Sequence, residues 1–83
     1  MSENVNYVRS SSYRTKVLKS LAGYPKMPSE IAKDSGIYQN HISNTLMQLK
    51  EHDLVECINP EVRKGRLYRL TDEGERIVDK MDD

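Results

Sequence analysis

Apolar residues recur at helical spacing along the first fifty residues. The first stretch has its apolar side chains at Tyr13, Val17, Leu18 and Leu21. This spacing predicts an amphipathic helix. One of the serines at 10–12 is expected to cap its start, and Gly23 to end it. Residues 1–9 lack a clear pattern and are interpreted as either a poorly ordered segment or an arm that contacts a second subunit.

Two more helices are expected before residue 54. Pro28 and Glu30 begin a short one, because proline is favoured at the first helical position and an early acid complements the positive helix end. Gly36 ends this helix. The next helix should run over residues 39–52 on the apolar positions Ile42, Leu46 and Leu49.

From residue 54 the pattern becomes that of β-strands. Segments 54–58 and 66–70 flank a turn-rich loop of seven residues, which predicts a β-hairpin. Thr71 is a suitable cap for a last helix, from Asp72 to about Met81. The order helix, helix, helix, hairpin, helix predicts an α+β fold, mostly α, in a single domain over residues 1–83.

The second and third predicted helices carry the pattern of a helix-turn-helix. Ala32 is small where the two helices are expected to cross, and Gly36 takes the tight turn. Ile31, Ile37 and Ile42 attach the pair to the core. A hairpin directly after the third helix converts this motif into a winged helix.

Several segments match a known group of proteins: 28–32, 36–37, 42–46, residue Leu49, 54–55, 59–68 and 68–71. On these residues the chain resembles winged-helix transcriptional regulators of the ArsR and MarR type, and its hairpin is similar to that of small stand-alone archaeal regulators. The resemblance implies a three-helix core with a β-hairpin wing and a C-terminal helix. It also implies that the third helix lies in the major groove of double-stranded DNA. The pattern is broken at Met27, Tyr38 and Asp53, where such proteins usually carry Thr, Ser and Gly, and weaker helix capping is expected there.

The outward face of the third helix is polar and uncharged near its start. Its candidate base contacts are Gln39, Asn40, Ser43 and Asn44. Asn and Gln can pair bidentately with adenine, and Ser can serve either edge of a base pair. The alternative is a plain solvated helix face. His41 on the same helix is expected at the surface or on a phosphate rather than on a metal.

The basic wing, residues 59–69, supplies the second candidate contact. Within its residues 63–69 there are four positive side chains and no acid: Arg63, Lys64, Arg66 and Arg69. They are expected on the phosphate backbone or in the minor groove, and Gly65 lets the loop approach another molecule closely. The alternative is an edge strand that carries charge to prevent aggregation.

The overall charge balance changes this picture in one respect. The chain has 13 Lys and Arg against 13 Asp and Glu, so its net charge of zero argues against binding driven by bulk charge. The charges alternate in blocks, however, because residues 1–26 and 63–69 are basic whereas residues 27–62 and 70–83 are acidic. Weak non-specific affinity is expected, and specificity must come from base contacts and dimerisation.

Other functional classes find no support in the residues. The single cysteine, Cys57, does not combine with His41 or His52 at zinc-ligand spacing, so neither a metal nor a cofactor is expected. No catalytic residue is assigned, and the chain is not expected to be an enzyme. No apolar run approaches the ~18 residues that cross a bilayer, and no secretory signal is recognisable, so a cytoplasmic location is expected.

A homodimer on a pseudo-palindromic DNA site is expected, because the core is thin and the terminal segments carry apolar stripes. The expected interface consists of Tyr7, Val8, Ile77, Val78 and Met81. Two alternatives stay open. One is a protein-protein interaction module of a larger transcription or chromatin complex, and the other is a sensor with a ligand pocket between two subunits, although no residue identifies an effector ligand.

Overall fold

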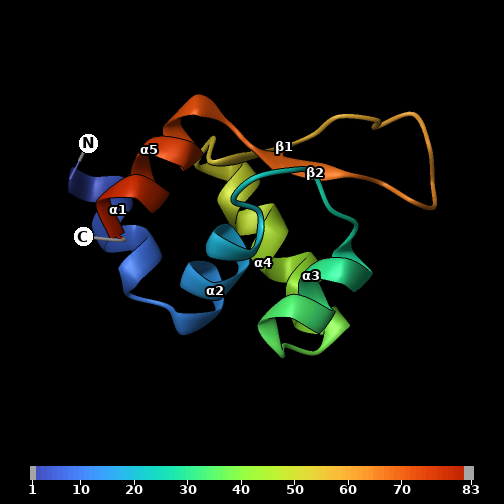
Figure 1. Ribbon diagram of the computed structural model, residues 1–83, viewed down its shortest axis with the longest axis horizontal. Helices are drawn as coiled ribbons and strands as arrows, with labels where there is room; N and C mark the ends of the chain where they lie inside the picture. Colours follow the sequence, from blue (N-terminus) through green and yellow to red (C-terminus); the bar gives the residue numbers. More distant parts are fainter. Residues whose placement is uncertain (1, 82–83) are drawn as a thin grey trace.

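Five helices and one hairpin follow one another in the computed structural model, which describes residues 2–81 (Figure 1). Helices α1 (Ser2–Arg9) and α2 (Ser12–Ser20) come first, followed by α3 (Pro28–Ser35) and α4 (Gln39–Glu51). Strands β1 (Val55–Cys57) and β2 (Tyr68–Leu70) pair antiparallel, and α5 (Asp72–Met81) follows them. The expected element order and the α+β class are confirmed, with α1 added.

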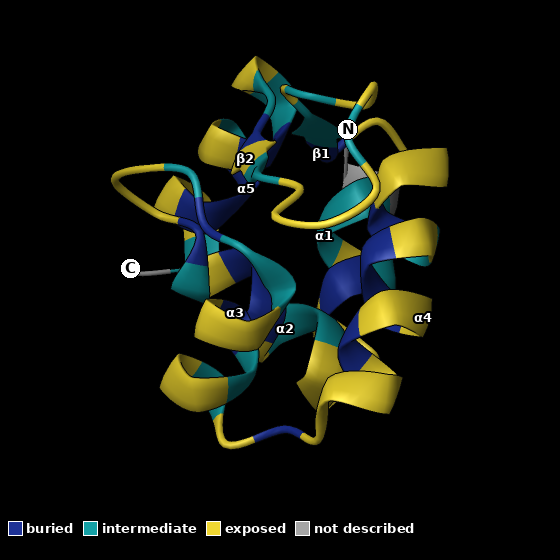
Figure 2. Cartoon of the chain, turned by 90° about the vertical axis from the view of Figure 1, so that its right-hand side faces the viewer, coloured by how far each residue is buried: buried dark blue, intermediate teal, exposed yellow. Residues whose placement is uncertain are grey.

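The core lies where α2, α3 and α4 pack together beneath the hairpin and the terminal helices (Figure 2). Its buried apolar side chains are Val8, Val17, Leu18, Leu21, Ile31, Ile37, Ile42, Leu46, Leu49, Leu54, Val55, Leu70, Ile77 and Val78. Tyr13, expected on the buried stripe of α2, is instead 41% exposed. Its ring lies against that of His41, with the centroids 5.2 Å apart.

Side-chain caps begin α2 and α5 as the sequence predicts. The Ser11 hydroxyl accepts a hydrogen bond from the backbone N–H of Arg14 at 3.3 Å. The Thr71 hydroxyl accepts one from the backbone N–H of Gly74 at 3.0 Å. Each bond satisfies a backbone donor that the first turn of a helix leaves without a partner, so both boundaries follow from local chemistry.

The helix-turn-helix pair, α3 and α4, also ends as expected. Gly36 after α3 and Asp53 after α4 are both left-handed, with φ of 75° and 61°. Met27 provides no side-chain cap for α3. Instead, the Glu30 carboxylate accepts a hydrogen bond from the Met27 backbone N–H at 2.8 Å. This bond offsets part of the helix stability that is lost without a side-chain cap at position 27.

The hairpin strands are shorter than the sequence predicts. The paired residues are Val55 with Leu70, Glu56 with Arg69, and Cys57 with Tyr68. Beyond them, the Ile58 N–H still donates to the Leu67 carbonyl oxygen at 2.9 Å, and the Asn59 side chain supplies the next bonds: its Oδ1 accepts from the Leu67 N–H at 2.8 Å, and its Nδ2 donates to the Gly65 carbonyl oxygen at 3.1 Å. The segment 58–67 is therefore a structured loop, which we call the hairpin loop.

A third backbone segment lies beside β2. Lys26 and Tyr68 exchange two backbone hydrogen bonds of 2.9 Å, a pairing that the sequence did not predict. The Lys26 side chain is buried, and its ammonium lies 2.5 Å from both an Asp34 carboxylate oxygen and the Ser20 carbonyl oxygen. These contacts tie α3 and the end of α2 to the hairpin, which fixes the hairpin relative to the helix-turn-helix.

The two terminal helices pack against each other within one chain (Figure 1). Val8, Ile77 and Val78, expected at an interface with a second subunit, are between 0% and 5% exposed and belong to the core. The expectation is wrong for these three residues, because the packing of α1 and α5 within one chain already buries them. Tyr7 and Met81 are half-buried at the edge of this core.

Candidate nucleic-acid interface

Helix α4 presents a polar side to solvent. Because Ile42, Leu46 and Leu49 point into the core, the opposite side of the helix is exposed (Figure 2). All four sequence-predicted base contacts lie on exposed positions, and two residues that the sequence reasoning missed extend the same side. We call the following residues the outer face of α4: Gln39, Asn40, Ser43, Asn44, Met47 and Lys50.

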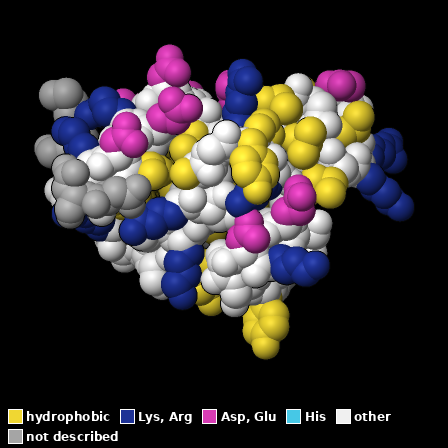
Figure 3. Space-filling model, viewed as in Figure 1, with side chains coloured by type: hydrophobic (Ala, Val, Ile, Leu, Met, Phe, Trp, Pro, Cys, Tyr) yellow, Lys and Arg dark blue, Asp and Glu magenta, His cyan; other side chains and the backbone are white. Residues whose placement is uncertain are grey.

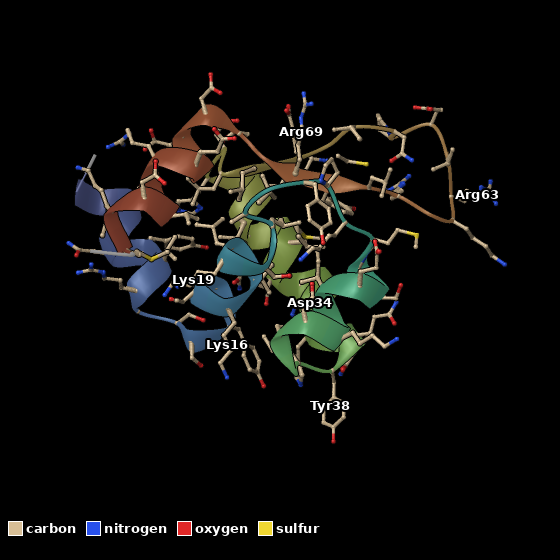
Figure 4. All side chains as sticks on the ribbon, viewed as in Figure 1. Lys16, Lys19, Asp34, Tyr38, Arg63 and Arg69 are labelled. Carbon is tan, nitrogen blue, oxygen red and sulfur yellow. The ribbon has the colours of Figure 1, made fainter. Side chains whose placement is uncertain are left out.

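The hairpin loop extends away from the helices (Figure 4), and Arg63 and Lys64 are exposed at neighbouring positions in it. Among the described residues, neither has a carboxylate within ion-pair distance. In the view of Figure 3, basic side chains stand at the end of this loop, whereas acidic side chains gather over α5. The loop therefore offers positive charge that is free to meet an anion.

Arg66 holds the hairpin loop in shape. Its guanidinium donates to the Val62 carbonyl oxygen at 2.7 Å and to the Pro60 carbonyl oxygen at 3.2 Å. The side chain remains exposed. Its positive charge is thus fixed in place, because the loop itself orients it.

Two adjoining hollows separate α4 from the hairpin loop. The first has a volume of about 260 Å³, with Ser43, Met47 and Lys50 on one wall and Arg66 on the other. The second, of about 350 Å³, is lined by Gln39, the start of α3 and the tip of the hairpin loop. We call the two together the channel. It joins the outer face of α4 to the cations of the hairpin loop across one concave surface.

Arg69 is not part of this surface. It points to the side of the hairpin away from α3 and α4 (Figure 4), where its Nε donates to a Glu56 carboxylate oxygen at 2.7 Å. The two residues are cross-strand partners, so the register of the hairpin enforces the pair. The structure thus brings three of the four basic residues of the predicted wing together and separates the fourth.

His41 and Arg14 lie at the flank of α4 that faces α1 and α2. The exposed His41 ring contacts Tyr13. Arg14 stacks over the Tyr7 ring at 3.8 Å and donates to Gln48 at 3.2 Å. Arg14 therefore serves to hold α1 against α2 and α4.

Another ion pair, between Arg76 and Glu73, lies on α5. The Arg76 guanidinium donates to both carboxylate oxygens of Glu73, at 3.0 and 2.5 Å. This hydrogen bonding lowers the pKa of the Glu73 carboxyl and raises the pKa of Arg76. The pair stabilises the terminal helix and does not contribute charge to the channel.

Within residues 2–81, no three His, Cys, Asp or Glu side chains are grouped so that they could hold a metal ion. The helices of this part of the chain are also too short or too polar for a membrane span.

The same arrangement of helices and hairpin occurs in solved proteins of low sequence identity. BigR, a transcriptional repressor from Xylella fastidiosa, matches with a TM-score of 0.78 and 23% identity over 96% of this chain and 78% of its own. The chain has the winged-helix fold. A second match is the winged-helix domain of a possible ArsR-family transcriptional regulator from Mycobacterium bovis, which is described as homodimeric and DNA-binding. It matches with a TM-score of 0.75 and 24% identity over 98% of this chain and 74% of its own.

Some winged-helix proteins that match are longer than this chain. A MarR family transcriptional regulator from Silicibacter pomeroyi matches with a TM-score of 0.76 and 20% identity over 98% of this chain but 64% of its own. The chain covers 50% of ZitR from Lactococcus lactis. No family model and no curated protein matches the sequence. In this winged helix, α3 and α4 form the helix-turn-helix and the hairpin loop occupies the place of the wing.

Proposed function

We propose that this chain is a sequence-specific, double-stranded DNA-binding transcriptional regulator. The observation that carries the proposal is the channel, where the outer face of α4, with Lys50 as its one cation, and the cations of the hairpin loop share one concave surface. A surface for DNA needs both parts, since phosphate contacts position a protein and contacts to base edges specify the sequence.

The outer face of α4 suits the major groove. The helix has 13 residues, hence a length of about 20 Å, and the groove is about 12 Å wide and admits an α-helix. Asn40 and Asn44 are one turn apart and exposed, with no acidic residue in the first turn of the helix. Each amide can pair bidentately with an adenine, which contributes roughly 1–3 kcal/mol of discrimination.

The hairpin loop suits the phosphate backbone or the minor groove beside that major groove. Arg63 stands at the far end of the loop from the helices (Figure 4), Lys64 lines the same hollow, and Arg66 lines both hollows of the channel. A DNA strand that passes along the channel would meet Lys50 on one side and Arg66 on the other. This arrangement favours contact with the DNA backbone over the alternative, in which the charge serves only to prevent aggregation at a strand edge.

We also propose that the chain binds DNA as a homodimer, with half-sites about one helical turn apart. The solved Mycobacterium bovis domain is described as homodimeric, which supports the proposal. Of the five residues first expected at the interface, Tyr7 and Met81 retain exposed surface. A dimer interface would therefore involve the edges of α1 and α5 rather than their buried stripes.

Selection of binding sites from random duplex DNA by the purified chain tests the proposed function. A single enriched motif, with a pseudo-palindromic repeat, is expected. Enrichment that disappears with Asn44→Ala but survives Tyr24→Ala, a substitution of an exposed residue outside the channel, would support reading by α4. If no motif is enriched and affinity for mixed-sequence DNA does not depend on salt, the interaction-module alternative replaces this proposal.

A further inference from the structure

Met47 is an apolar residue on a surface that is otherwise polar. Its side chain is 61% exposed, although the adjacent core positions Leu46 and Leu49 are 3% and 0% exposed. The core of α4 is complete without it, because those leucines and Ile42 already form the buried stripe. Packing within the chain therefore does not explain an apolar side chain at position 47.

The position of Met47 on α4 is that of a reading residue. It follows Asn40 by seven residues and Ser43 by four, which places the three on one side of the helix. Met47 also lines the same hollow as Ser43, Lys50 and Arg66, between α4 and the hairpin loop. Any duplex that lies across the outer face of α4 and the channel would cover its side chain.

We propose that Met47 is a specificity-determining residue that contacts the C5 methyl group of a thymine in the major groove. This inference rests on the proposed function and adds to it one base preference. The thymine methyl is the apolar group on the major-groove edge, whereas the other edges present donors and acceptors. A thioether side chain is apolar and flexible, so it can cover a methyl group and cannot satisfy a strong donor or acceptor.

Helix geometry sets where this thymine lies. Met47 follows Asn40 by seven residues, a rise of about 10 Å along the axis. Base pairs are spaced about 3.4 Å apart, so the thymine is expected about three base pairs from the base that Asn40 contacts. The preference should therefore appear at a defined distance within each half-site.

Replacement of thymine by uracil tests this contact, because uracil lacks only the C5 methyl group. In the site selected by the full chain, each thymine is replaced one at a time, and affinity is measured by fluorescence anisotropy. The unaltered protein should lose about fourfold in affinity at one thymine of the half-site, the amount that corresponds to one buried methyl group. Met47→Ala should bind the thymine and uracil sites equally.

Two variants serve as controls. Met47→Leu keeps an apolar side chain and should retain most of the discrimination between thymine and uracil. Tyr24→Ala removes a side chain that is 64% exposed but lies outside the channel, and it should retain all of the discrimination. A circular dichroism spectrum of each variant establishes that the helices are intact.

The outcomes separate this inference from the proposed function. If a motif is enriched but no uracil replacement weakens binding, or if Met47→Ala discriminates as well as the unaltered protein, Met47 does not read thymine and the proposed function stands. If the chain enriches no motif from random DNA, the proposed function fails and this inference fails with it.

Discussion

Arg63 and Arg69 offer a matched pair of substitutions in one hairpin. Both are exposed arginines, but they stand on different sides of it. Arg63 lines the channel, and no described carboxylate pairs with it. Arg69 is bonded to Glu56 at 2.7 Å on the side away from α4. Arg63→Ala should therefore remove a DNA phosphate contact, and Arg69→Ala should not.

The size of the difference follows from counterion release. Each phosphate contact on duplex DNA contributes about 0.9 to the slope of log affinity against log salt concentration. When the salt concentration rises from about 50 to 200 mM, a variant that lacks one phosphate contact per bound copy should therefore lose affinity by a factor about 3.5-fold smaller than the unaltered protein does. Arg63→Ala should show this reduced slope for every duplex sequence, and Arg69→Ala should keep the slope of the unaltered protein.

Fluorescence anisotropy with a labelled mixed-sequence duplex, at a series of salt concentrations, measures both slopes. Circular dichroism establishes that both variants are folded. This control is needed because Arg69→Ala breaks an exposed ion pair, which contributes about 0–1 kcal/mol to the free energy of unfolding. Equal slopes for the two variants, or a larger change with Arg69→Ala, would refute the assignment of the two sides of the hairpin.

Three further substitutions test other parts of the structure. A Cβ at Gly74 would lie 2.1 Å from the Leu54 carbonyl oxygen. Gly74→Ala should therefore lower the free energy of unfolding, measured in urea, by about 1–3 kcal/mol, although alanine is the better helix former. As a control, Glu75→Ala at the next position should change that free energy by less than about 0.5 kcal/mol. Because the Arg76 hydrogen bond lowers the pKa of Glu73, the ionised carboxylate stabilises the fold above the ordinary glutamate pKa, and this contribution is lost as pH falls through the lowered value. Between about pH 7 and pH 3, the Glu73→Gln variant should therefore lose less thermal stability than the unaltered protein. An equal loss in the two proteins would show that ionisation of Glu73 does not stabilise the fold. Asn44→Ala should relax the preference at one base position by about 1–3 kcal/mol in a binding-site selection while the salt slope stays the same.

The elements that local chemistry specifies could be predicted from the sequence. Caps at Ser11 and Thr71, the left-handed residues Gly36 and Asp53, and the buried stripe of α4 all depend on neighbours within a few residues. For the same reason the polar outer face of α4 was predictable, since the helical period fixes which residues oppose the stripe.

The remaining features depend on contacts between distant parts of the chain. Helix α1 has only 8 residues, too few for a stable helix by itself, and is held by tertiary contacts: the Tyr7 ring stacks on His52 with the centroids 3.6 Å apart, and Arg14 donates to the Tyr7 carbonyl oxygen at 2.8 Å. The pairing of Lys26 with Tyr68 joins residues 42 positions apart along the sequence. The separation of Arg69 from the channel depends on the strand register that pairs it with Glu56, which the residues alone do not fix.

Met47 was not among the residues predicted to contact DNA. Leu46 and Leu49 close to it in the sequence belong to the core. The helical wheel separates it, because seven residues after Asn40 and four after Ser43 is the exposed side. The helical period of the sequence therefore contains the signal that places Met47 on the outer face of α4.

A titration of the isotopically labelled protein with its selected duplex, followed by two-dimensional NMR, tests the central claim most directly. The claim is that DNA occupies the channel between α4 and the hairpin loop. The largest shifts of backbone amide signals should fall on the outer face of α4 and on residues 58–67, while signals of Glu56, Arg69 and the exposed side of α5 stay in place. Shifts concentrated on α5 with α4 unchanged would contradict it.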